Sequence, residues 1–196
     1  MEGISQDLVL NIDYRYTPQW RFKFETKHAG FKETLQKNRV DRSTYNSIGS
    51  GKHLQGTDFP SVIAKVKGHS AEIEKVYKEL LAIESIFPAG IVNSKDEAYE
   101  NYKKLKSDIE NELKFQADYL TVLNFFGKEF ASKGNPAQFL NSVEDFISFF
   151  ESKDRFPSTI VSEAQTVIAE RLKEIVPFYD QRLSGKENAK PFDENT

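Results

Sequence analysis

The chain has 196 residues, of which 38% are hydrophobic, and its 27 Lys and Arg against 30 Asp and Glu give a formal net charge of −3. It contains no Cys, which excludes disulfide bonds and thiolate metal sites. Sixteen Phe and eight Tyr supply bulky side chains for a core, so the composition favours a folded domain over a disordered chain.

Residues 8–27, LVLNIDYRYTPQWRFKFETK, alternate as a half-buried β-ribbon does. One face of the second strand would carry Trp20, Phe22 and Phe24, and Pro18 would mark the turn because proline cannot donate to a β-ladder. A two-stranded ribbon is marginal in water. We therefore expect the helices or another chain to cover its aromatic face, and at least one of its edges to be available to a partner strand.

Residues 28–57 show a weaker secondary-structure pattern. A short helix could form around 31–38, whereas residues 41–58, DRSTYNSIGSGKHLQGTD, are rich in Ser, Gly, Thr, Asn and Asp and predict a loop. Part of this loop, NSIGSGKH, is superficially like a phosphate-binding loop, but Asn46 and His53 stand where that motif requires Gly and Ser or Thr. Residues 49–52 could still form an anion-binding nest, although a plain loop is the favoured interpretation.

From residue 58 onward the hydrophobic period becomes that of a helix. Apolar residues at alternating spacings of four and three predict a helix over 58–87, which Gly68 could interrupt. The capping sequence at 94–97, SKDE, predicts the start of a second helix. If that helix is continuous from about 95 to 132, it measures roughly 55 Å at about 1.5 Å per residue.

Two more helices follow. Asn135-Pro136 places Asn at an N-cap and Pro at the first helical position, which predicts a third helix. Pro157-Ser158 begins the fourth, which Pro177 should kink or end. We expect the apolar residues of both helices, Ile147 and Leu172 among them, to point inward.

These elements predict a mainly α protein of the α+β class, with an N-terminal β-hairpin packed on an elongated bundle of about four helices. We expect residues 1–57 to form the hairpin and a basic, Gly- and Ser-rich loop region. Residues 58–183 would form the helical bundle, and residues 184–196 a flexible tail.

The first residues, MEGISQD, lack the basic and apolar parts of a signal peptide. No apolar run approaches the roughly 18 residues that a membrane span requires. We therefore expect a soluble, cytoplasmic protein with no membrane partner.

No catalytic, cofactor-binding or metal-ligating residues are predicted. The three histidines, His28, His53 and His69, lie on different predicted elements and lack the spacing of a metal-ligand pair. No nucleophile elbow occurs. An enzyme with scattered catalytic residues remains a third hypothesis, and its pocket would be lined by Arg39, Asp41, Arg42, Lys52 and His53.

The charge is distributed unevenly. Residues 1–69 carry 11 Lys and Arg against 7 Asp and Glu, whereas residues 70–196 carry 16 against 23, so the two parts present opposite potentials. The predicted partner-binding residues are Arg15, Arg21, Lys23, Lys27, Arg39, Arg42, Lys52 and His53.

We predict a non-catalytic interaction, assembly or regulatory protein. It would bind a protein partner, or a second copy of itself as a homo-oligomer, through the basic hairpin and the 39–57 loop. Nucleic-acid binding by the same basic region is the alternative, because phosphate contacts need such a cluster.

Overall fold

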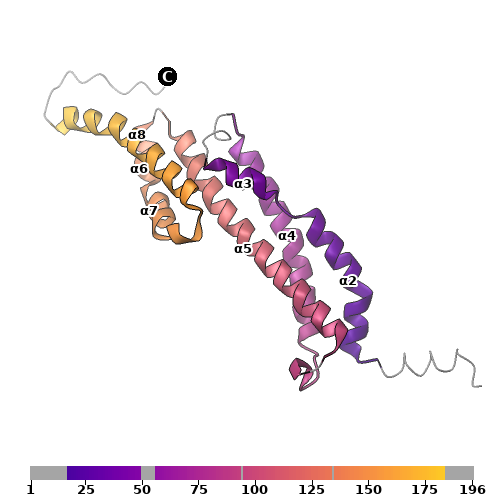
Figure 1. The fold of residues 1–196 in the computed structure, drawn as a ribbon. Helices are drawn as coiled ribbons and strands as arrows, with labels where there is room; N and C mark the ends of the chain where they lie inside the picture. The colour runs from indigo at the N-terminus through magenta and orange to yellow at the C-terminus, as the bar shows by residue number, and fades with distance from the viewer. Residues whose placement is uncertain (1–16, 50–55, 94, 134, 184–196) are drawn as a thin grey trace, which may run out of the picture. The chain divides into compact units, whose positions relative to one another are not determined.

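The computed structural model describes residues 17–49, 56–93, 95–133 and 135–183, and within these ranges every regular element is a helix (Figure 1). The α-helices are α2 (Gln19–Lys37), α3 (Arg42–Ile48), α4 (Phe59–Glu84), α5 (Glu97–Ala131), α6 (Pro136–Asn141), α7 (Val143–Glu151) and α8 (Ser158–Leu183). Two short 3₁₀ helices are η1 (Ile91–Asn93) and η2 (Lys153–Arg155).

The predicted β-hairpin is wrong. Its second strand, residues 20–26, is the first part of α2, and Pro18 is the N-cap of that helix instead of a hairpin turn. Its first strand lies outside the described residues. The side chains that α2 buries are four or seven positions apart and share one helical face: Trp20, Phe24, Phe31 and Leu35. The intervening Phe22, which mimics a strand-like alternation, is 47% exposed.

The predicted loop at 41–58 contains a helix, α3. The Asp41 carboxylate accepts hydrogen bonds from the backbone N–H of Ser43 at 2.9 Å and from its hydroxyl, so polar residues typical of a loop serve here as a helix cap. Gly49 follows α3, where an added Cβ would lie 2.7 Å from the Cβ of Thr159 in α8. The glycine therefore allows two helices to approach closely, and the rest of the expected anion nest lies outside the described residues.

Both predicted long helices are confirmed as α4 and α5. Helix α4 runs through Gly68 without a break, and α5 is a single helix of 35 residues. Ser94, the expected cap of α5, lies outside the described residues. The carboxylate of Asp96 accepts a hydrogen bond from the Tyr99 N–H at 3.1 Å and caps the first turn.

The remaining helices are also confirmed, with two differences. Asn135 caps α6 as predicted, because its side chain accepts a hydrogen bond from the Gln138 N–H at 3.1 Å. The predicted third helix is divided at Ser142 into α6 and α7. Pro177 lies inside α8, which continues to Leu183.

Residue contacts divide the chain into two compact units. Unit 1 is Met1–Arg39 with Gly68–Lys114, and unit 2 is Val40–Lys67 with Phe115–Thr196. Each unit therefore contains one part of α4 and one part of α5.

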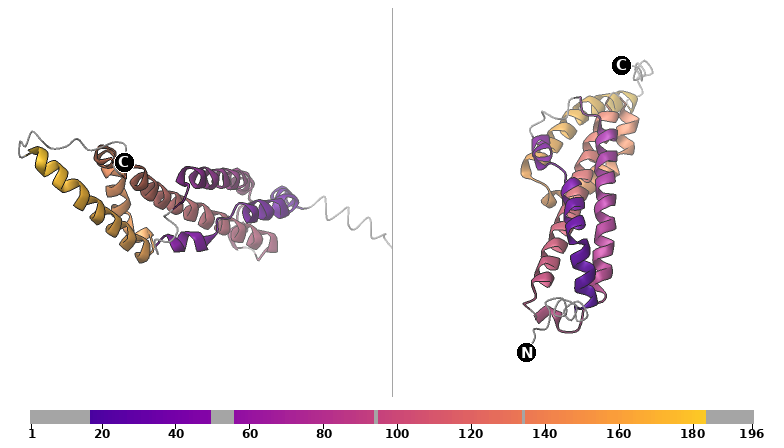
Figure 2. Two further views of the ribbon diagram at one scale, coloured as in Figure 1. Left: turned by 90° about the horizontal axis from the view of Figure 1, so that it is seen from above. Right: turned by 90° about the vertical axis from the view of Figure 1, so that its right-hand side faces the viewer.

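In unit 1, α2 lies along its parts of α4 and α5 (Figures 1 and 2). The ring of Trp20 lies edge-on to Phe87 at 5.0 Å, and the ring of Phe24 lies edge-on to Tyr102 at 5.8 Å. Trp20 and Phe24 are therefore covered by helices of their own chain.

Unit 2 is built around phenylalanine rings. The ring of Phe125 in α5 lies 4.9 Å from Phe146 and 4.4 Å from Phe149, both in α7. A buried cation, Arg171 of α8, is 4% exposed and donates hydrogen bonds to the backbone carbonyl of Ser132 and to a carboxylate one turn along α8. It thus connects α8 to the chain directly after α5.

Candidate functional site

The predicted partner-binding residues are only partly described. Arg15, Lys52 and His53 lie outside the described residues. Of the others, Arg42 belongs to unit 2, and those in unit 1 are Arg21, Lys23, Lys27 and Arg39.

Two of these basic residues are engaged within unit 1. The Arg21 guanidinium pairs with Glu25 at 2.8 Å and with Asp96 at 3.3 Å, and the hydrogen bond to Glu25 raises the pKa of Arg21. The Lys27 ammonium pairs with Glu79 of α4 at 2.5 Å. These exposed pairs contribute little stability, but they place α2 against carboxylates of α4 and of the start of α5.

The uneven charge of the sequence is thus balanced in part within one unit. Residues 17–39 contain six Lys and Arg against two Asp and Glu, whereas residues 68–114 contain seven against ten. Because the basic helix packs on the acidic segments, its charge by itself does not require an external acidic partner.

Arg42 and Asp41 have structural roles in unit 2. The guanidinium of Arg42 lies 4.1 Å from the ring centre of Phe115, a cation–π distance. The ring of Tyr45 packs edge-on to Phe115 at 5.1 Å, and burial raises the pKa of Tyr45 to about 12. Asp41 caps α3 and Arg42 contacts Phe115, so these two residues of the expected enzyme pocket have different structural roles.

Arg39 lines a small hollow in unit 1 of about 200 Å³. Lys32 and Gln36 share this hollow with Arg39 at helical spacings of four and three, so three hydrogen-bond donors face one space. Asp108 of α5 also lines it and opposes the binding of an anion.

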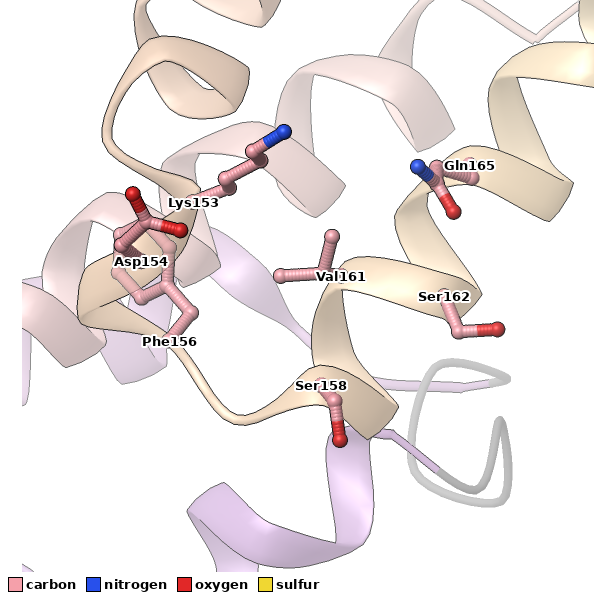
Figure 3. Close-up of a pocket in the computed structure, with 7 residues that line it drawn as sticks. All are labelled: Lys153, Asp154, Phe156, Ser158, Val161, Ser162 and Gln165. Atoms are coloured by element: carbon pink, nitrogen blue, oxygen red, sulfur yellow. The ribbon is translucent and has the colours of Figure 1, made fainter.

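A polar hollow of about 470 Å³ lies at the start of α8 (Figure 3). Lys153 of η2 and the Gln165 amide stand on opposite sides of it with Val161 between them, whereas the hydroxyls of Ser158 and Ser162 are turned away from that gap (Figure 3). Among the described residues of unit 2 there is no histidine that could act as a base for these hydroxyls.

An apolar groove with a volume of about 410 Å³ lies between α6, α7 and α8. Buried Phe139 and Phe146 form its floor. Ile147 of α7 and Leu172 of α8 form its walls and are 51% and 45% exposed, although the sequence analysis placed both in the core. Val143, Phe150, Glu151 and Ile168 complete the lining.

The groove continues along α8. A second hollow, of about 480 Å³, shares Leu172 and includes Val176, which is also exposed. Ile168, Leu172 and Val176 are spaced by four residues, so they form one stripe on the helix. The sequence contains a signal for this surface, because five of the eight residues from Val143 to Phe150 are apolar, more than a single buried face of α7 requires.

The histidines form no metal site within the described ranges. His28 packs against the Phe24 ring at 4.8 Å, where burial lowers its pKa, and His69 Nδ1 lies 2.8 Å from the Asn38 Oδ1. His53 lies outside these ranges. No cluster of three or more His, Asp or Glu side chains is placed to hold a metal ion among the residues with described positions.

Comparisons of the chain with models of protein families, with curated proteins and with solved structures gave no match. In the described part of the chain, no helix combines the length and the apolar character needed to cross a membrane.

Proposed function

We propose that this is a non-catalytic binding protein that holds an amphipathic helix of a partner protein in the apolar groove of α6, α7 and α8. The observation that carries the proposal is the exposure of Ile147 and Leu172 on opposite walls of a groove whose floor is aromatic. Concave apolar surfaces with exposed walls are typical of interaction sites on folded proteins.

A helix suits this groove in length and in spacing. Ile168 and Val176, the two ends of the stripe, are eight positions apart, or about 12 Å along α8. That distance equals about two helical turns, over which a partner helix presents apolar anchors at positions i, i+4 and i+7. Each large apolar side chain that becomes fully buried contributes roughly 1.5–3 kcal/mol before the cost of association.

The test uses a fluorescein-labelled helical peptide with leucines along one face and equal numbers of Lys and Glu on the other. Fluorescence anisotropy measures its Kd for the full chain, for the double variant Ile147→Ser/Leu172→Ser and for the control Val92→Ser. Val92 lies in unit 1 and is 73% exposed, so its replacement removes an exposed apolar side chain without changing the groove.

We expect the double variant to weaken binding at least tenfold and the control variant to leave it unchanged. Absence of binding to the unmodified chain, or equal binding by the double variant, would refute the proposed function. Because both replaced side chains are exposed, circular dichroism should show an intact helical fold in every variant.

A second candidate function is nucleic-acid binding by unit 1, and the observation that favours it is a hollow lined by two basic residues, Lys32 and Arg39, against the one carboxylate of Asp108. The exposed Lys23 would add a further phosphate contact. If this function is correct, the affinity for duplex DNA should fall steeply with salt, and Arg39→Ala should lower the log–log salt slope by about 0.9. No shift on a native gel at low salt would exclude it.

A further inference from the structure

We propose that the helix bound in the groove is basic, with Lys or Arg beside its apolar face; this inference rests on the proposed function. The apolar wall of α7 is bordered by carboxylates. Glu144 and Glu151 lie three positions before and four positions after Ile147, so all three residues share one face of the helix. Glu151 itself lines the groove.

Neither of these carboxylates is neutralised within the described structure. Both side chains are exposed, and neither forms an ion pair with a described residue. Their neighbour Asp145, in contrast, pairs with Lys128 of α5. Among the described residues, two carboxylates thus stand without an ion-pair partner at the border of an apolar surface.

The surrounding segment is acidic as well. Residues 135–183 contain eight Asp and Glu against five Lys and Arg. Two of the five basic residues are already engaged, since Arg155 pairs with Asp118 and Arg171 is buried with hydrogen-bond partners of its own. A third basic residue, Lys173, lines the second hollow beside the stripe on α8.

A groove with an acidic border selects its partner by charge. A helix with Lys or Arg beside its leucines would place cations against Glu144 and Glu151, whereas an acidic helix would bring like charges together. The same border disfavours an anionic lipid surface as the occupant. The observations therefore favour a basic amphipathic helix over an acidic one or a membrane.

The experiment compares two labelled peptides with identical leucine positions, one with Lys and the other with Glu at every flanking position. Anisotropy is measured at low and high salt with the full chain, with Glu151→Lys and with the matched variant Glu170→Lys. Glu170 is exposed on α8 but lies about 200° around the helix from both Ile168 and Leu172, so its replacement changes the net charge equally without changing the border of the groove.

We expect the Lys peptide to bind about tenfold more tightly than the Glu peptide at low salt, with a smaller difference at high salt. Glu151→Lys should reduce or reverse this preference, and Glu170→Lys should leave it largely unchanged. Equal affinities of the two peptides, with binding still weakened by Ile147→Ser/Leu172→Ser, would overturn the basic partner and leave the proposed function in place.

Other outcomes count against a basic partner or against the groove itself. Failure of both peptides to bind would refute the proposed function. Light scattering that shows a stable dimer, which Ile147→Ser dissociates, would identify a second copy of this chain as the occupant and overturn the proposal. A loss of preference with Glu170→Lys equal to that with Glu151→Lys would also overturn it, because the discrimination would then follow net charge alone.

Discussion

Two phenylalanines in α2 provide a direct test of the helical structure of the N-terminal segment. Phe24 is 1% exposed, with its ring 5.8 Å from Tyr102 and 4.8 Å from His28, whereas Phe22 is 47% exposed. In a β-strand these residues, two positions apart, would share one face and have similar burial. In a helix they lie about 200° apart, and only one of them reaches the core.

The difference in burial sets the expected magnitudes. Truncation of a fully buried Phe costs about 3–5 kcal/mol, because apolar contact is lost and a cavity remains. Phe22 keeps about half of its surface in solvent, so Phe22→Ala should cost at most about 1 kcal/mol. Since domains are stable by only about 5–15 kcal/mol, Phe24→Ala should shift the unfolding transition strongly.

Urea denaturation followed by tryptophan fluorescence measures both variants. Trp20 is the only Trp of the chain, it is buried, and it belongs to the same core as Phe24, so its emission reports the unfolding of unit 1. We expect a clearly lower urea midpoint for Phe24→Ala and little change for Phe22→Ala. Equal losses for the two variants would contradict the helix and restore a strand-like arrangement.

Three further predictions concern packing, pH and the buried cation. Gly49→Ala should lower the free energy of unfolding by about 1–3 kcal/mol, since its Cβ would force α3 and α8 apart. As a control, Gly68→Ala should raise the free energy of unfolding by about 0.4–1 kcal/mol, because its Cβ meets nothing within 4 Å. A stabilising effect of Gly49→Ala would contradict the packing of α3 on α8. The hydrogen bond from Lys106 holds the pKa of Glu84 below its ordinary value, so the stability that ionised Glu84 provides is present above about pH 4.3 and is lost as the pH falls through the folded-state pKa. Glu84→Gln should therefore lower the thermal midpoint at pH 7 and have no effect in strong acid, and a difference that persists at low pH would contradict the assignment. Arg171→Met removes the hydrogen-bond donor to the backbone carbonyl of Ser132, directly after α5, and should lower the free energy of unfolding by about 1–3 kcal/mol. Hydrogen exchange near the end of α5 should become faster. Unchanged exchange there would contradict the role of Arg171.

Prediction from the sequence was most accurate where local signals agree. The cap at Asn135 and the two long helices α4 and α5 are confirmed, because a cap and a period of 3.6 residues act over neighbouring positions. The hairpin is wrong because the alternation of Trp20, Phe22 and Phe24 is compatible with two periods over so short a stretch, and the later Phe31 and Leu35 support the helical one.

The candidate site was not predicted from the sequence for a different reason. Ile147 and Leu172 fit the apolar pattern of their helices as well as buried residues do, and a pattern does not state whether a neighbouring helix is present to cover a given face. Charge shows the same limit, because the sequence does not indicate that Arg21 and Lys27, predicted to bind a partner, also pair with Asp96 and Glu79 of their own unit.

Sequence by itself determined that the chain is helical after residue 58 and where several of those helices begin, since caps and periodicity depend on residues only a few positions apart. Tertiary structure alone decided which apolar faces are buried, which charges are neutralised and which groove stays exposed. Those outcomes depend on contacts between residues far apart in the chain, such as Phe24 with Tyr102 and Gly49 with Thr159.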